Sequence, residues 1–164
     1  MKRAQLSDAA ELIAGNIASR TYHAPWTTPF VDRDGFDRWL ATTQTDRCVG
    51  LVARHRPTGG IVGVINFTEI VRGGLQSAYT GFAGMATLAR LGLMTRALKA
   101  AVDFAFAELD LHRLEANIQP DNARSIALVG RVGFRKEGYS PHYLKIDGVW
   151  RDHERWAITR EDVA

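Results

Sequence analysis

The stretch Thr87–Leu98, TLARLGLMTRAL, joins an arginine-bearing loop to the start of an apolar helix, and Gly92 stands directly before that helix. The first four N–H groups of a helix have no partner inside it, and the helix dipole adds partial positive charge there. Because glycine has no side chain, an anion can approach such amides closely. The stretch therefore predicts either a tight turn or an anion-binding loop.

Two common nucleotide motifs do not fit this stretch. A P-loop needs Lys and then Ser or Thr after its last glycine, whereas Leu93, Met94 and Thr95 follow Gly92. A dinucleotide fingerprint needs three glycines in register, and these are missing. If the loop binds an anion, it belongs to another kind of site.

The hydrophobic pattern on both sides of the stretch predicts an α+β fold. Helical patterns come first, and three strand patterns follow at 47–55, 61–70 and 75–82, the first two joined by the turn RPTGG. After the helix that begins near Gly92 come a strand at 112–118, a second helix and a closing hairpin with its turn at Asp147-Gly148. This order is not a uniform βαβ repeat, so a doubly wound nucleotide fold is not expected.

Composition predicts one soluble domain over 1–164. The chain is 46% apolar and 24% charged, and no apolar run reaches the roughly 18 residues of a membrane span. The N-terminus lacks the apolar core of a signal peptide, and the single cysteine, Cys48, fits a small core residue in a reducing compartment. We therefore expect a cytoplasmic protein without a membrane partner. The net charge of +3 suits an anionic ligand or the ribosome, but also a mildly basic surface.

Longer motifs follow the opening stretch in a fixed order. They are Asn122-x-x-Ser125, then Gly133-Phe134-x-x-Glu137-Gly138-Tyr139, then Trp150-Arg151-Asp152-His153. In these segments, and over nearly its whole length, the chain resembles the GNAT acetyltransferase superfamily, in particular its RimJ/RimL type of protein N-acetyltransferase. The resemblance implies a twisted mixed sheet of about seven strands flanked by about four helices. The fourth and fifth strands, 75–82 and 112–118, would splay apart to admit the pantetheine arm of acetyl-CoA.

The resemblance also implies a coenzyme site. Backbone groups of one loop would hold the pyrophosphate, and Asn122 would bind the pantetheine or nearby polar atoms; the loop residues are Ala89, Arg90, Leu91, Gly92, Leu93, Met94 and Thr95. The chain departs from the family pattern at Ala89, where a polar residue is usual, at Arg90, often glycine, and at Met94, often small. These departures bear on how tightly the loop binds the coenzyme and not on where the site lies. Acetyl-CoA is the only co-substrate that the resemblance implies, and no metal is expected.

Acetyl transfer to an amine needs a group that removes a proton from the amine. The resemblance suggests Glu69 for this role, although a solvated glutamate at a strand end is the other interpretation. Ser125 matches the family's candidate for protonating the leaving thiolate, and it could instead cap its helix. Tyr139 is a less favoured acid. A backbone N–H near Gly81 or Phe82 would meet the developing oxyanion.

Other residues give weaker indications. Trp26 could form a wall of the acceptor cleft or anchor its loop in the core. His112 and His153 lie in strand patterns beside charged residues, lack metal-ligand spacing and are predicted to be structural.

Three functions stay open from the sequence. The favoured one is acetylation of the N-terminal α-amine of a protein, with a ribosomal protein as the target that the resemblance implies. The second is acetylation of a small amine such as an aminoglycoside or a polyamine, and the third is a non-catalytic module that binds the coenzyme or the ribosome. The segments HAPWTTPF and EIVRGG contain few carboxylates besides Glu69, which favours the first over a highly cationic acceptor. No direct contact with nucleic acid is required, and a monomer and a homodimer are both compatible with the sequence.

Overall fold

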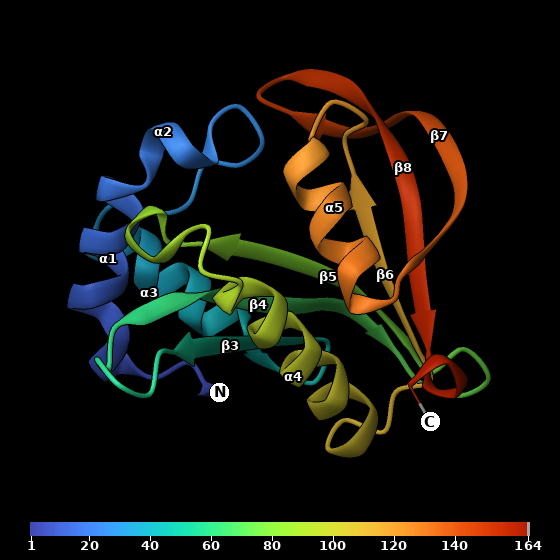
Figure 1. The fold of residues 1–164 in the computed structure, drawn as a ribbon, viewed down its shortest axis with the longest axis horizontal. Helices are drawn as coiled ribbons and strands as arrows, with labels where there is room; N and C mark the ends of the chain where they lie inside the picture. The colour runs from blue at the N-terminus through green and yellow to red at the C-terminus, as the bar shows by residue number, and fades with distance from the viewer. Residues whose placement is uncertain (164) are drawn as a thin grey trace.

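The computed structural model describes residues 1–163 and shows one mixed sheet with helices on both faces (Figure 1). The strands are β1 (Lys2–Arg3), β2 (Gln44–Thr45), β3 (Cys48–Arg54), β4 (Ile61–Val71), β5 (Ser77–Gly84), β6 (Arg113–Ile118), β7 (Arg135–Ile146) and β8 (Val149–Thr159). The α-helices are α1 (Ala9–Ala18), α2 (Arg20–His23), α3 (Arg33–Thr42), α4 (Leu93–Ala107) and α5 (Ala123–Val132). Short 3₁₀ helices lie at Leu6–Asp8, Ala86–Leu88 and Arg160–Asp162.

The strands lie in the order β1-β3-β4-β5-β6-β8-β7, and β2 pairs with β3. Every pairing is antiparallel except that of β5 with β6, whose connection runs through α4. A parallel pair needs such a crossover. The predicted α+β class is therefore confirmed. Residues 1–163 form eight strands and five α-helices, against about seven and about four implied by the resemblance. The strands β1 and β2 and the helix α2 are too short to leave a periodic pattern in the sequence.

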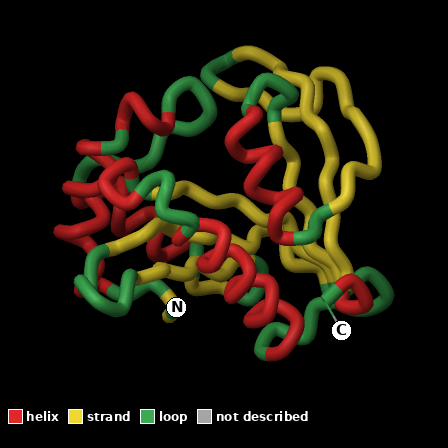
Figure 2. The backbone as a smooth tube through the Cα atoms, viewed as in Figure 1, coloured by secondary structure: helices red, strands yellow, loops and turns green. Residues whose placement is uncertain are grey.

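The splayed pair of strands predicted from the resemblance is present. β5 and β6 pair at only three positions, Ser77 with Arg113, Ala78 with Leu114 and Tyr79 with Glu115. Beyond these positions the two strands diverge, as the ribbon and the tube both show (Figures 1 and 2). The sheet thus has two arms that are joined at one end.

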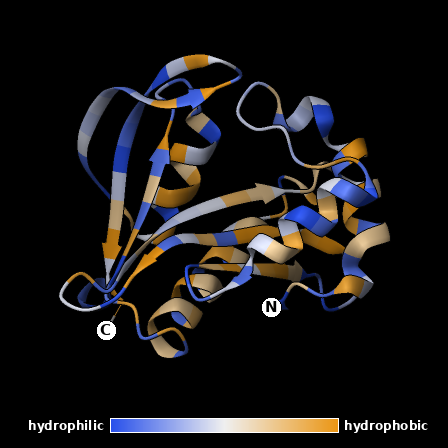
Figure 3. Cartoon of the chain, turned by 180° about the vertical axis from the view of Figure 1, so that it is seen from behind, coloured by the Kyte–Doolittle hydropathy of each residue, from blue (hydrophilic) through white to orange (hydrophobic). Residues whose placement is uncertain are grey.

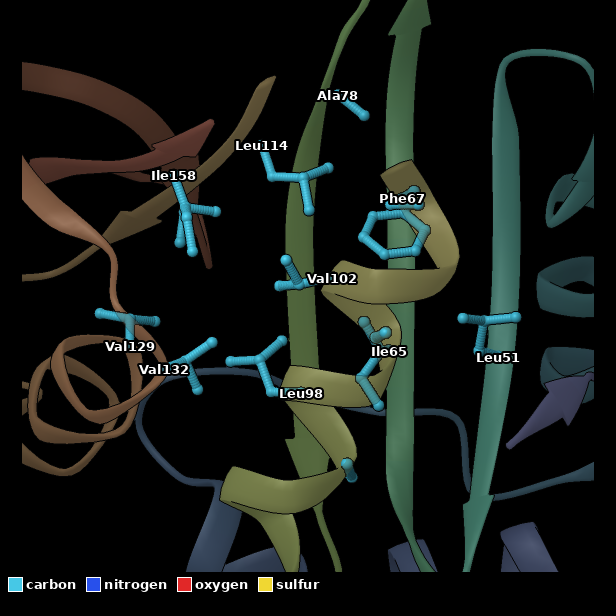
Figure 4. Packing of buried hydrophobic residues seen from close by; sticks show 14 of the residues in the cluster. Leu51, Ile65, Phe67, Ala78, Leu98, Val102, Leu114, Val129, Val132 and Ile158 are labelled. Atoms are coloured by element: carbon cyan, nitrogen blue, oxygen red, sulfur yellow. The ribbon is translucent and has the colours of Figure 1, made fainter. Parts of the chain in front are cut away.

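Two clusters of buried side chains hold the helices to the sheet. The larger cluster lies under α4 and α5 and includes Phe67, Leu98 and Val129, all shielded from solvent (Figure 4). The smaller one packs α1 and α3 against the opposite face, through Leu12 and Phe36. The hairpin of β7 and β8 is hydrophilic over much of its length (Figure 3). Each face of the sheet therefore has its own core, and the hairpin forms the outer edge.

Cys48 lies on β3, buried as predicted, and its burial raises the pKa of the thiol. Within residues 1–163, the helices are all too short or too polar to cross a membrane. The last residue of the predicted domain, Ala164, lies outside the described residues.

Candidate functional site

The loop before α4 presents backbone amides without internal partners. Gly92 is the N-cap of α4 with φ of +69°, in the left-handed region that favours glycine. The first backbone bond of the helix runs from Arg96 N to the Gly92 carbonyl at 3.2 Å. Within the described chain, no acceptor takes the amides of Leu93, Met94 or Thr95. Since a Cβ placed on Gly92 would meet no atom within 4 Å, the space before these amides is open.

These amides border a cavity of about 850 Å³ that runs between the two arms of the sheet. Both arms contribute to its wall, β5 from one side and β6 with α5 from the other. Of the residues predicted from the sequence, the cavity brings together Trp26, Gly81, Phe82, Ala89, Arg90, Gly92, Leu93, Met94, Thr95, Asn122 and Ser125. It does not include Leu91, which is 63% exposed, or Glu69.

Asn122 and Ser125 begin α5 at the cavity wall. The Oδ1 atom of Asn122 accepts a hydrogen bond from the Ser125 amide at 3.2 Å, so Asn122 caps the helix. The capping role considered for Ser125 therefore falls to Asn122. The Ser125 hydroxyl has no hydrogen-bond partner among residues 1–163 and is available to the cavity.

A contact between α2 and α5 crosses this cavity. The Arg124 guanidinium of α5 lies 4.4 Å from the centre of the Tyr22 ring of α2 and donates to the Tyr22 carbonyl at 3.0 Å. Both residues line the cavity. A cation over an aromatic face gives a modest attraction, so this contact spans the space between the arms.

Glu69 lies apart from the cavity. It ends the regular part of β4, with φ of +48° next to a register shift between Thr68 and Val71. Its exposed carboxylate forms an ion pair with Arg47. The shift changes the direction of the strand end, which an alternating pattern cannot reveal. Glu69 is therefore not among the residues that line the cavity, and its role as a base stays a prediction from the resemblance.

Unpaired polar atoms concentrate around the site. The described residues contain five buried side-chain polar atoms without a hydrogen-bond partner, and all belong to residues that line this cavity or an adjoining one of about 570 Å³. The five atoms are His23 Nδ1, Thr80 Oγ1, Asn117 Oδ1, Asn16 Oδ1 and Asn66 Oδ1. Buried polar groups are normally paired, and exceptions call for an explanation. Their common location indicates a place built to bind a polar molecule.

The charges at the cavity are of one sign. Its described lining residues include Arg90, Arg124 and Arg131 and no Asp or Glu. Together with the free amides before α4, these guanidinium groups suit a phosphate-bearing ligand. Among residues 1–163, no group of three or more His, Cys, Asp or Glu is placed to hold a metal ion.

Sequence reasoning missed several residues of this site. His23, Thr80 and Asn117 line the cavity, but no motif or spacing marks them. His153, predicted to be structural, also lines it with only 3% of its surface exposed. By contrast, His112 pairs with Glu161 at the surface, outside this cavity. Tyr139 is likewise exposed, with its hydroxyl bonded to Asp152.

Comparison with known proteins identifies the family. Residues 1–135 match the family model described as the acetyltransferase (GNAT) domain. The chain belongs to the GNAT acetyltransferase family. This membership confirms the resemblance drawn from the sequence, and the splayed strands with the open amides before α4 are the features of that family present here.

Two relatives share appreciable sequence identity with this chain. The [ribosomal protein uS5]-alanine N-acetyltransferase of Escherichia coli (strain K12) is 44% identical over 102 residues, covering 62% of this chain and 53% of that protein. The chain thus matches only about half the length of this curated relative. The structure of Mycobacterium smegmatis RimJ in complex with CoA-disulfide superposes with a TM-score of 0.87 at 29% identity, covering 98% of this chain and 81% of that one.

A third comparison concerns the fold alone. The structure of spermidine N-acetyltransferase from Vibrio cholerae in complex with CoA and spermine has a TM-score of 0.81 at 19% identity, covering 98% of this chain and 95% of that one. Proteins named for a protein acceptor and for a polyamine acceptor therefore share this fold. The acceptor has to be argued from the residues of the site.

Proposed function

We propose that this protein transfers an acetyl group from acetyl-CoA to the N-terminal α-amine of a protein. The observation that carries the proposal is the meeting of two features in one cavity, the open amides of Leu93, Met94 and Thr95 and the gap between β5 and β6. The amides and Arg90 would bind the pyrophosphate, and Asn122 would contact the pantetheine. The M. smegmatis relative, solved with a CoA derivative, supports this assignment.

The coenzyme would supply an activated acetyl group as a thioester. In the proposed reaction the amine nitrogen attacks the thioester carbonyl carbon, so that a C–N bond forms and the C–S bond breaks. Backbone N–H groups near Gly81 or Phe82 would stabilise the oxyanion that develops between these events. The leaving thiolate would take a proton from the Ser125 hydroxyl, which would recover one from the new amide nitrogen.

The charge of the cavity favours an α-amine over a polycation. A polyamine or an aminoglycoside carries several ammonium groups, which carboxylates usually bind, and the described lining of the cavity has none. An α-amine has a pKa near 7.7–8.0, against about 10.4 for lysine, so a weak base frees it at neutral pH. The E. coli relative named for ribosomal protein uS5 supports a ribosomal protein as target. Trp26 would line the path of the incoming peptide.

A small amine is the second candidate acceptor, because a spermidine acetyltransferase shares the fold. We also propose a cytoplasmic location and a single domain over 1–164, as monomer or homodimer.

A panel of acceptors tests the proposed function. Purified protein is mixed with acetyl-CoA and with peptides that begin with alanine or serine, the same peptides with a blocked N-terminus and a free lysine, spermidine and an aminoglycoside. We expect turnover of the free α-amines and none of the blocked peptides, with mass spectrometry locating the acetyl group on the N-terminus. Faster acetylation of spermidine or of the aminoglycoside would assign the enzyme to small amines. No turnover of any acceptor would favour a binding module.

Ser125 offers a separate test of the chemistry. Ser125→Ala removes the hydroxyl but keeps the amide that Asn122 caps. We expect kcat to fall by roughly 10²-fold, the usual contribution of a positioned acid, with the Kd for the coenzyme unchanged. The matched control is Ser7→Ala, exposed in the 3₁₀ helix Leu6–Asp8 and outside the cavity lining. Equal kcat values for both variants would remove Ser125 from the reaction.

A further inference from the structure

His153 presents one ring nitrogen that is free to accept a proton. Its Nδ1 lies 3.0 Å from the Arg151 carbonyl oxygen. A carbonyl can only accept, so Nδ1 carries the hydrogen and the neutral ring keeps its lone pair on Nε2. None of the described residues hydrogen-bonds to Nε2, although His153 is buried and lines the cavity. The fold thus holds this imidazole in one tautomer beside the site.

Two tyrosine rings link His153 to the point where β5 and β6 diverge. The Tyr143 ring centre lies 5.7 Å from that of His153, and the Tyr143 hydroxyl donates to the Tyr79 hydroxyl at 3.3 Å. Tyr79 is the last residue of β5 that pairs with β6. Since Ala78 belongs to the core under α4, Tyr79 points to the opposite face of the sheet. A tyrosine pair therefore connects His153 to the start of the gap on the face away from α4.

The neighbouring acids and phenols are unsuited to accept a proton. Asp152 accepts hydrogen bonds from the Tyr139 hydroxyl and the His142 amide, and Glu154 pairs with Lys136. Glu115, opposite Tyr79 where the strands part, is held by Arg113 at 2.8 Å. Burial and the bond to Tyr79 raise the pKa of Tyr143 to about 12, so this phenol stays protonated.

We propose that His153 is the base that removes a proton from the acceptor ammonium. This inference rests on the proposed function and names the group that serves it. One proton of the ammonium passes to Nε2, directly or through a water molecule, and the freed lone pair attacks the thioester carbon. The resulting imidazolium later gives its proton to solvent. The second proton leaves the nitrogen as the amide forms and ends on the coenzyme thiol, so the reaction releases one proton overall.

Several charged or titratable groups surround the imidazole and enter the interpretation of a pH profile. They are Tyr143 and His142 on β7, Asp152, Glu154 and Arg155 on its own strand, Tyr79 and Glu115 at the start of the gap, and Tyr22, His23 and Arg124 among the residues that line the cavity. His23 is the main rival, because it is the other imidazole of the cavity. Its Nε2 lies 2.8 Å from the Gly84 carbonyl and its Nδ1 is buried without a partner.

The experiment measures kcat/KM of His153→Ala and of variants of the rival bases His23 and Glu69. All are made in the full chain and assayed with acetyl-CoA and the best peptide of the panel. We expect kcat/KM to fall by roughly 10²-fold or more, the size of a general-base contribution, while the Kd for the coenzyme stays near wild type. Because His153 is buried, the truncation should also lower the melting temperature, so activity is measured where circular dichroism shows the variant folded. Added imidazole in the tens of millimolar should restore at least part of this activity. His153→Gln, which keeps more of the volume, should lose activity without rescue. His55→Ala, in the turn between β3 and β4, is the matched control.

The pH profile separates His153 from its rivals. The wild-type kcat/KM should rise with pH, and the inflection of this rise should be absent in His153→Gln but present in His23→Gln and Glu69→Gln. Three results would overturn the proposal. The first is wild-type activity in His153→Ala, and the second is a loss of activity in His153→Ala that added imidazole does not restore. The third is the loss of the pH inflection in His23→Gln or in Glu69→Gln. Those results all require an active wild type, so a wild type that acetylates nothing refutes the proposed function instead.

Discussion

We expect Gly92→Glu to abolish binding of acetyl-CoA, with at least a 100-fold rise in Kd measured by calorimetric titration. A side chain at this position would project into the open space before the amides of Leu93, Met94 and Thr95. Its carboxylate would compete with a phosphate for those amides and repel it. A 100-fold change in Kd corresponds to about 2.7 kcal/mol.

Backbone strain is the other effect of this substitution, and the chain offers a matched control for it. Gly59 also has a positive φ, +75° against +69° for Gly92, and a Cβ there also meets nothing within 4 Å. The control variant is therefore Gly59→Glu. Forcing a non-glycine residue into the left-handed region costs roughly 1–2 kcal/mol, so Gly92→Glu and Gly59→Glu should lose similar stability. Only Gly92→Glu should lose the coenzyme. Equal Kd values for the two variants would contradict the proposed pyrophosphate site.

We expect Leu98→Ala to lower the free energy of unfolding by about 2–5 kcal/mol. Leu98 is fully buried on α4, within the cluster that joins this helix to the sheet and to α5 (Figure 4). The loss combines the transfer free energy of the removed methyl groups with the cavity left behind. Since a domain is stable by roughly 5–15 kcal/mol in total, this is a large fraction. Urea unfolding followed by circular dichroism measures the change.

Leu75→Ala is the matched control for Leu98→Ala. Leu75 lies in the connection between β4 and β5 and is 61% exposed, so the same substitution should change stability by no more than about 0.5 kcal/mol. A comparable loss in both variants would show that leucine removal acts through the unfolded chain rather than through the packing of α4.

Parts of the site that are contiguous in the chain could be predicted from the sequence. The loop around Gly92 and the start of α5 each carry their signal within a few residues, and both line the cavity as expected. The β5 and β6 strands were also found, because their patterns are long enough to detect. Their divergence came from the family resemblance, since a strand pattern does not reveal its partner.

Residues whose position depends on contacts between distant segments could not be predicted. His153 reaches the cavity because β8 pairs with β6, the strand on one side of the gap, and a strand pattern does not reveal its partner. A bulge changes the alternation of the faces of a strand, and a single sequence does not mark it. This explains why Glu69 lies outside the cavity. His23 is positioned by α2, a helix of only four residues that leaves no periodic signal.

The divergence of β5 and β6 also bears on aggregation. Beyond Tyr79 and Glu115, β5 and β6 no longer pair with each other. Each strand then has one edge without a hydrogen-bonded neighbour, so the sheet contains two free edges in its interior. Exposed edges of this kind recruit strands from other molecules. Here the two edges border one cavity, and Arg124 and Tyr22 meet across it. The molecule can thus keep unpaired main chain for a slender ligand while giving a second protein chain little room to add a strand.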